Sequence, residues 1–288
     1  VVVPMEAYGK TIRLLMELQG KLGLRLKRVW PNTEAIIESI GREIKLVLIE
    51  TITNPTLKVI DADSVAGACR DQGVILVVDN TFASPLLYNP LESGAHIVVH
   101  STTKYIAGHN DVIGGALVGG SRVIKELWVW RAMMGTIMQP MEAYLTLRGV
   151  KTLELRFRRQ SESALEVAEF LEDHPRVEEV LYPGLESSPY KSIADRLFKE
   201  RLYGGVVSFK VRGSSKDALR VLRRVRLIKP SPSLGGTESL ITYPVISAAS
   251  SIPPDDREKL GITENLLRLS VGLEDPADLI EDLDRALS

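Results

Sequence analysis

Three stretches of this 288-residue sequence end an apolar run in polar side chains of the kinds that bind ligands and move protons. They are Glu50–Pro55, Asp79–Thr81 and Ser101–Lys104. The apolar run before each is short and rich in β-branched residues, which predicts a strand. Ligands of open α/β sheets bind at the carboxyl ends of the strands. A single aspartate there often only caps the next segment, but three such strand ends in succession favour a site.

The lysine of the third stretch indicates the chemistry of that site. Lys104 directly follows Ser-Thr-Thr, and burial would lower its pKa and make its amine a nucleophile able to form a Schiff base. The alternative is a surface lysine, as most lysines are. A carboxylate on the neighbouring strand end, Asp79, can keep a pyridinium nitrogen protonated. Ser101, Thr103 and nearby backbone amides can bind a phosphate. Together these residues predict a pyridoxal phosphate site.

A candidate for binding a substrate carboxylate lies near the end of the sequence. The run Leu266–Val271 alternates, so that Arg268 and Ser270 share one face of a predicted strand. A guanidinium on a rigid strand is suited to a bidentate grip on a carboxylate. From spacing alone, a solvated edge residue is the alternative.

His100 and His109 have no carboxylate cluster at ligand spacing, so we expect no metal site there.

The elements that must position these residues alternate in the first half of the chain. Strands are predicted at residues 45–50, 74–79, 95–100 and 112–118, with a helix at 64–72. Apolar runs of this kind are typical of strands buried on both faces of a mostly parallel sheet. The sequence therefore predicts an α/β fold.

The second half mixes its elements without that regular order. Strands are predicted at 205–211 and 266–271, and helices at 216–226 and 276–287. This indicates a smaller α+β domain. A single long helix is expected over 145–171, joining the two. The predicted domains are residues 1–155 and 156–288.

Composition excludes several classes of protein. The chain carries 36 Lys and Arg against 37 Asp and Glu, which offers no electrostatic case for a nucleic acid or an anionic membrane as partner. Its apolar runs are too short to cross a bilayer. The single cysteine, Cys69, excludes an internal disulfide and suits a reducing compartment. We expect a cytoplasmic globular protein.

Several ordered motifs carry a resemblance to a known family. Asp79–Phe82, His100–Tyr105 and Gly108–Asp111 resemble the Cys/Met-metabolism family of pyridoxal phosphate-dependent enzymes. Further matches, spread over essentially the whole chain, are Tyr8–Thr11, Glu50–Pro55, Arg148–Leu153, Tyr182–Leu185, Ser233–Leu240 and Arg268–Glu274. The resemblance implies the aspartate aminotransferase-like architecture called fold type I, with a cofactor-binding large domain over 1–155.

The resemblance also implies a role for each residue around the cofactor ring. Lys104 would carry pyridoxal phosphate through a Schiff base and then move protons between substrate carbons. Asp79 would pair with the pyridine nitrogen, and Thr81 would orient that carboxylate or touch the ring. Asn54 would hydrogen-bond the ring hydroxyl.

Further implied roles concern the phosphate and the substrate. Ser101 and Thr103 would bind phosphate oxygens. Tyr8 would stack on the ring and take part in proton transfer at the leaving group. Arg268 would hold the α-carboxylate of the substrate, and Ser233 would support that end.

The expected reaction is γ-elimination or γ-replacement on homoserine- or homocysteine-derived amino acids, of the cystathionine γ-synthase or γ-lyase type, in sulfur amino-acid metabolism. Methionine γ-lyase is an alternative that Lys10 weakens, because those enzymes typically carry a cysteine there. O-acetylhomoserine sulfhydrylase is a further alternative. Pro232 weakens the γ-lyase hypothesis, since γ-lyases often carry a glutamate just before the Ser-Leu-Gly motif.

Members of the family normally carry a segment ahead of the Tyr-Gly motif that this sequence does not contain. It supplies a glycine-rich phosphate loop and an arm that reaches into a neighbouring subunit, in tetramers built as dimers of dimers. We therefore expect a large domain shortened at its N-terminus. A second hypothesis is a catalytically incompetent fragment, against which the presence of Lys104, Asp79 and Arg268 argues.

Overall fold

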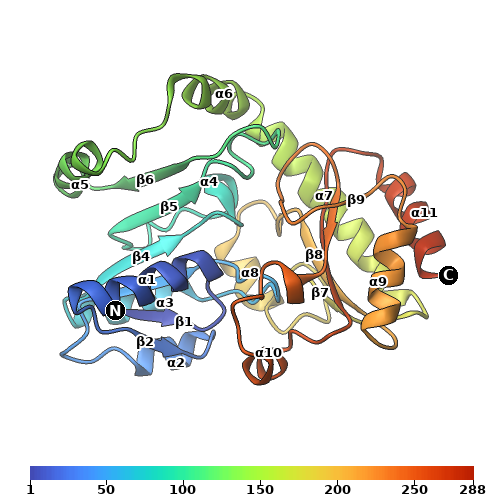
Figure 1. Ribbon diagram of the computed structural model, residues 1–288, viewed down its shortest axis with the longest axis horizontal. Helices are drawn as coiled ribbons and strands as arrows, with labels where there is room; N and C mark the ends of the chain where they lie inside the picture. The colour runs from blue at the N-terminus through green and yellow to red at the C-terminus, as the bar shows by residue number, and fades with distance from the viewer.

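A computed structural model describes residues 1–288, and its first half forms a six-stranded sheet. The strand order is β2-β1-β3-β4-β5-β6 (Figure 1). Every neighbouring pair from β2 to β5 is parallel, and only β6 runs antiparallel. The strands are β1 (Val2–Pro4), β2 (Lys27–Val29), β3 (Leu46–Glu50), β4 (Ile75–Asp79), β5 (Ile97–Ser101) and β6 (Gly115–Gly119). The predicted mostly parallel α/β sheet is confirmed.

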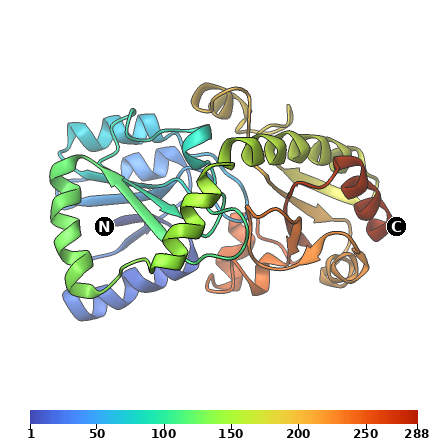
Figure 2. The same ribbon diagram turned by 90° about the horizontal axis from the view of Figure 1, so that it is seen from above.

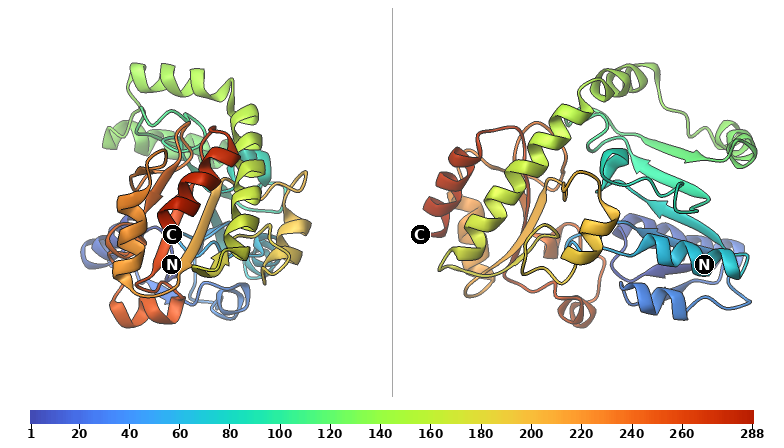
Figure 3. Two further views of the ribbon diagram at one scale, coloured as in Figure 1. Left: turned by 90° about the vertical axis from the view of Figure 1, so that its right-hand side faces the viewer. Right: turned by 180° about the vertical axis from the view of Figure 1, so that it is seen from behind.

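Helices cover both faces of this sheet, which explains why its strands are apolar on both sides. Helix α1 lies on one face and α3 on the other, as Figure 1 and the rear view in Figure 3 show. Val2, Val47 and Val78 are accordingly fully buried. The helices of this half are α1 (Gly9–Leu22), α2 (Thr33–Glu38), α3 (Ala62–Asp71), α4 (Ser84–Leu87), α5 (Ser121–Met134) and α6 (Pro140–Val150).

Strand register brings the polar strand ends together at one edge. Glu50 at the end of β3 lies opposite Asp79 at the end of β4, and Asp79 lies opposite Val99 of β5. Because the strands are parallel, the segments that follow them leave the sheet on the same side.

The second half forms a five-stranded, mostly antiparallel sheet of order β7-β8-β11-β10-β9. Helix α7 packs on β7, β8 and α11, and Figure 2 shows it running along this layer. The strands are β7 (Val177–Leu181), β8 (Val206–Val211), β9 (Lys229–Pro230), β10 (Leu240–Thr242) and β11 (Leu266–Ser270). The helices are α7 (Leu153–Asp173), α8 (Lys191–Leu197), α9 (Ser215–Arg224), η1 (Pro244–Ile246), α10 (Pro254–Leu260) and α11 (Pro276–Leu287).

The prediction of one helix over 145–171 is wrong. The chain forms α6 and α7, with a break at Lys151 and Thr152. Gly149 lies so close to the loop after β5 that a Cβ there would come within 2.1 Å of the Ala107 carbonyl oxygen. The Arg156 guanidinium donates a hydrogen bond to the Gly149 carbonyl at 2.8 Å. Packing of α6 against that loop therefore replaces the helical bonds that would have joined α6 to α7.

The two sheets share one apolar core. It extends from Val47 of β3 through Phe157 of α7 to Leu269 of β11. No helix combines the length and the apolar character needed to cross a bilayer.

Candidate active site

A cavity of about 630 Å³ lies at the carboxyl ends of β3, β4 and β5 and is closed by segments of the second half. Eight of the nine residues predicted for the site line it: Tyr8, Asn54, Asp79, Thr81, Ser101, Lys104, Ser233 and Arg268. The ninth, Thr103, is not among the lining residues. Its hydroxyl instead accepts the Gly114 amide at 3.0 Å, so its role toward a phosphate stays a prediction.

Lys104 is held in the turn that follows β5. Its amide donates to the Ser101 carbonyl at 3.3 Å and its carbonyl accepts the Gly108 amide at 2.8 Å. The side-chain nitrogen Nζ donates to Ser233 Oγ at 3.2 Å. Burial, followed by the positive charges of Arg268 and Lys10, lowers the Lys104 pKa to about 8. At one pH unit below this pKa about a tenth of the amine is uncharged, far more than for an ordinary lysine, and this fraction can act as nucleophile and base.

Asp79 ends β4 with one carboxylate oxygen engaged and one left for a ligand. Oδ1 accepts both the Thr81 amide at 3.0 Å and the Thr81 hydroxyl at 2.5 Å. The same hydroxyl oxygen accepts the Ser101 amide at 2.9 Å, so Thr81 ties the end of β4 to the end of β5. Burial raises the Asp79 pKa, and the two hydrogen bonds from Thr81 oppose that rise. A half-buried carboxylate with a free Oδ2 favours a cationic N–H partner in the cavity.

Arg268 lies on β11, an interior strand of the second sheet, and is only 2% exposed. The alternative of a solvated edge residue is thereby excluded. Its Nη1 donates to Asn54 Oδ1 at 2.8 Å, and Nη2 donates to the carbonyls of Pro232 and Ser233 at 2.9 and 3.2 Å. Burial lowers the Arg268 pKa to about 10. Its buried Nε donor has no partner in the protein, which is the arrangement expected where a ligand oxygen completes the site.

Tyr8 stands at the start of α1 with its side chain 45% exposed. Its amide donates to Glu50 Oε1 at 2.7 Å. At the next position a Cβ on Gly9 would come within 2.4 Å of Ser251 Oγ, so any other residue would force the Ser251 side chain to turn away. This close approach lets the start of α1 and the segment 247–251 line the same cavity.

Glu50 is a cavity residue to which sequence reasoning assigned no role. Burial, followed by repulsion from Asp79, raises its pKa well above the usual range. The available signal was its place at a strand end, directly opposite Asp79 in the register. Other lining residues carried no such signal, because they come from α1, from the end of η1 and from the irregular segment after it: Lys10, Arg13, Ile246, Ser247, Ala248, Ser250 and Ser251.

These side chains fit pyridoxal phosphate. The cavity presents a partly neutral amine on Lys104 and a free carboxylate oxygen on Asp79, and it is lined by Arg268, whose buried Nε donor has no partner. An aldehyde, a pyridinium nitrogen and an amino-acid carboxylate are the groups that these side chains would bind, in that order. The fold and the site thus define a pyridoxal phosphate-dependent enzyme.

Comparison with known proteins specifies the family. The model of the Cys/Met metabolism PLP-dependent enzymes matches residues 1–288. The chain is 43% identical over 289 residues to cystathionine gamma-synthase of Mycobacterium tuberculosis, covering 100% of this chain and 73% of the relative. It is 40% identical over 291 residues to cystathionine beta-lyase of Coxiella burnetii, covering 100% of this chain and 75% of the relative.

A solved structure agrees with both relatives. The cystathionine gamma synthase from Xanthomonas oryzae pv. oryzae in complex with cystathionine superposes with a TM-score of 0.95 at 39% identity, over 99% of this chain and 74% of that one. This chain belongs to the family of Cys/Met metabolism PLP-dependent enzymes, and pyridoxal phosphate is its cofactor. The predicted family, fold type and cofactor are confirmed.

Proposed function

We propose that this protein catalyses γ-elimination or γ-replacement on homoserine- or homocysteine-derived amino acids, with cystathionine as substrate or product. The observation that carries the proposal is the convergence of Lys104, Asp79 and Arg268 on one cavity. The relatives named for cystathionine support this choice of substrate.

The cofactor supplies an electron sink that stabilises negative charge developing on the substrate. Lys104, Asp79, Asn54 and Ser101 are the residues that would hold it. Asp79, braced by Thr81, would keep the pyridine nitrogen protonated through its free Oδ2.

Lys104 is the base that we assign to the substrate carbons. An amine with a pKa of about 8 can take a proton from Cα and then from Cβ at neutral pH, and return it later. Its hydrogen bond to Ser233 Oγ keeps Nζ on the side of the cavity where Arg268 lies. Arg268 would hold the α-carboxylate, so that the same Cα always faces Lys104.

Tyr8 is the group that we assign to the leaving γ-substituent. Its hydroxyl makes no hydrogen bond within the protein, and Tyr8 lines the cavity. A phenol in that position can hold a proton for a departing thiolate.

The test is turnover by the protein reconstituted with pyridoxal phosphate. We expect wild type to release 2-oxobutyrate and cysteine from cystathionine, or to form cystathionine from cysteine and an O-acylated homoserine. Lys104→Ala should abolish turnover while the far-ultraviolet circular dichroism stays that of wild type. Pyruvate with homocysteine as the only products would instead indicate β-elimination, which the similarity to a cystathionine beta-lyase makes the second candidate. No turnover of any of these substrates would contradict the proposal.

We also propose that the protein is a homo-oligomer, a dimer of dimers. Support comes from exposed apolar side chains on α5, where Trp128, Trp130 and Met134 are 59%, 60% and 69% exposed. A monomer seldom leaves so many large apolar side chains in water. Sedimentation equilibrium is the test, and a monomer at micromolar concentration would contradict it.

Two further proposals concern organisation and location. We propose residues 1–155 as the cofactor-binding domain and 156–288 as the second domain, which corresponds to the two sheets. Amide hydrogen exchange tests this division: residues of the first sheet and of the second should exchange at different rates, and equal rates would contradict it. We propose a cytoplasmic location, supported by the single, buried cysteine Cys69. Fractionation of the source cells tests it.

A further inference from the structure

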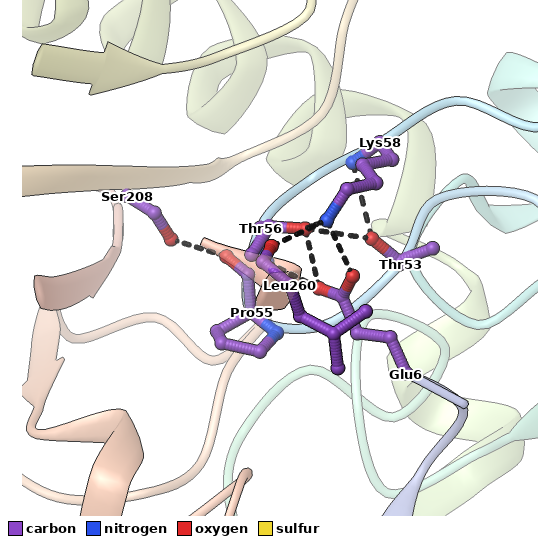
Figure 4. A network of polar contacts seen from close by, with 7 residues as sticks. All are labelled: Glu6, Thr53, Pro55, Thr56, Lys58, Ser208 and Leu260. Atoms are coloured by element: carbon purple, nitrogen blue, oxygen red, sulfur yellow. Dashed lines mark hydrogen bonds and ion pairs between the residues drawn. The ribbon is translucent and has the colours of Figure 1, made fainter. Parts of the chain in front are cut away.

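A buried ion pair lies behind the Asn54 loop and outside the cavity. The side chain of Glu6, just after β1, is fully buried, and its Oε2 pairs with Lys58 Nζ at 2.7 Å (Figure 4). Its Oε1 accepts the Thr56 amide at 2.9 Å and the Thr56 hydroxyl in a short hydrogen bond. Removing a carboxylate from water is costly unless partners satisfy it, and here each oxygen has one. Neither Glu6 nor Lys58 lines the cavity.

The Lys58 ammonium also reaches the other half of the molecule. It donates to the carbonyl of Leu260, the last residue of α10, at 2.9 Å. The end of a helix presents unpaired carbonyls and partial negative charge, which favour a cation. One ammonium therefore joins the end of β1 to α10.

The segment between these anchors has little freedom. Thr53 Oγ1 accepts the Lys58 amide at 3.1 Å, and the Leu57 amide donates to the Thr53 carbonyl at 3.2 Å. From the second sheet, Ser208 Oγ donates to the Pro55 carbonyl at 2.7 Å (Figure 4). Asn54 is thus flanked by residues that are held from both halves of the molecule.

Asn54 connects this loop to a residue of the cavity, Arg268. Its Oδ1 accepts Nη1 of Arg268 at 2.8 Å and is the only side-chain group hydrogen-bonded to that guanidinium. A shift of the loop would remove this contact and leave the guanidinium held only through Nη2, by the carbonyls of Pro232 and Ser233, so that the direction of its Nε donor would be less fixed.

We propose that the Glu6–Lys58 pair positions Asn54 and, through Asn54, the guanidinium of Arg268. Glu6 and Lys58 are positioning residues that touch neither cofactor nor substrate. The inference rests on the proposed function, in which Arg268 holds the carboxylate of the substrate.

The test is Lys58→Met in the reconstituted enzyme, with cystathionine as the varied substrate. We expect KM to rise at least about tenfold while kcat stays within about threefold, because a displaced carboxylate site weakens binding more than it affects the proton transfers at Lys104. Lys58→Arg, which keeps the positive charge, should restore most of the affinity.

Lys210→Met is the matched control. Lys210 has the same 15% side-chain exposure as Lys58 and forms an ion pair with Glu179 at 2.6 Å, but its ammonium bonds neither to Glu6 nor to any residue of the Asn54 loop. Its KM should equal that of wild type. An equal rise in KM in both variants would mean that Lys58 supports only general stability, and would overturn the proposal.

A double mutant separates positioning through Asn54 from independent effects. Asn54→Ala alone should raise KM, and Asn54→Ala with Lys58→Met should match it within about twofold, since the second change then has nothing left to position. Effects that multiply in the double mutant would refute transmission through Asn54.

Amide hydrogen exchange gives a second readout that needs no substrate. In Lys58→Met, peptides covering residues 52–58 and 266–270 should exchange faster than in Lys210→Met, while β4 should not change. Unchanged exchange in both peptides would refute the proposal. If Lys58→Met does not fold, Ser208→Ala, which removes only the contact to Pro55, should raise exchange in 52–58. If wild type turns over no substrate, the proposed function fails, and exchange alone decides the positioning inference.

Discussion

Replacing Lys104 with methionine is expected to stabilise the cofactor-free protein at neutral pH, although it abolishes activity. The change keeps an unbranched side chain but removes an ammonium that the fold partly buries beside Arg268 and Lys10. Burying this charge therefore lowers the free energy of unfolding of wild type, whereas the variant has no charge to bury.

The magnitude follows from the pKa of Lys104, which falls from 10.5 to about 8 on folding. At about 1.4 kcal/mol for each pKa unit, this amounts to about 3 kcal/mol against the protonated amine. This energy is an upper bound, because Lys104 keeps some contact with solvent.

The dependence on pH has a definite sign. Below pH 8 both folded and unfolded wild type carry the proton, and the folded state bears the whole penalty. Between pH 8 and 10.5 the unfolded chain binds more protons than the folded one, so the free energy of unfolding of wild type rises relative to the variant. The free energy of unfolding of Lys104→Met should thus exceed that of wild type most below pH 8. Near pH 10.5 the difference should approach a constant value that no longer depends on pH.

Urea unfolding of the cofactor-free proteins at pH 7, 8, 9 and 10 measures this difference. Lys104→Gln serves as a second neutral replacement and should give the same dependence on pH with a different constant offset. A difference between wild type and variant that does not change with pH would refute the depressed pKa, and with it the argument that this amine is a base at neutral pH.

Three further changes test the remaining cavity contacts. Arg268→Lys should raise KM for the amino-acid substrate roughly 10- to 100-fold with a smaller effect on kcat, since an ammonium cannot bind a carboxylate bidentately. Steady-state kinetics measure this, and an unchanged KM would contradict the role assigned to Arg268. Asp79→Asn should lower kcat by on the order of 10²-fold or more, because a neutral amide cannot hold the pyridine nitrogen protonated; activity within twofold of wild type would count against it. Thr81→Val should lower the free energy of unfolding by about 1–3 kcal/mol, since the Asp79 carboxylate and the Ser101 amide each lose a hydrogen-bond partner. Urea unfolding measures this change, and an unchanged midpoint would contradict the role of the Thr81 hydroxyl.

Local sequence patterns predicted which strand ends line the cavity. The apolar runs before Glu50, Asp79 and Ser101 form neighbouring parallel strands, and parallel pairing necessarily places their polar ends at one edge. Lys104 follows from the same geometry, because it lies only three residues beyond the end of β5. The family motifs assigned the reaction type to residues that the spacing had already brought together.

Other features depended on contacts between residues far apart in the chain. Arg268 is 214 positions from Asn54, and the two meet only because the second sheet closes against the first. No local pattern placed Glu6 beside Lys58, or Lys58 beside Leu260. The break between α6 and α7 was missed for the same reason, since it depends on the approach of Gly149 to Ala107.

The sequence by itself determined the α/β class, the family, the cofactor and the pair of Lys104 and Asp79, because strand periodicity and short spacings act over a few residues. Only the tertiary structure decided that Arg268 is buried, that Thr103 turns to Gly114 and that Glu6 and Lys58 hold the Asn54 loop. Burial and the pairing of distant charges are properties of the packed chain, since the cost of desolvating a group depends on which other groups fold around it.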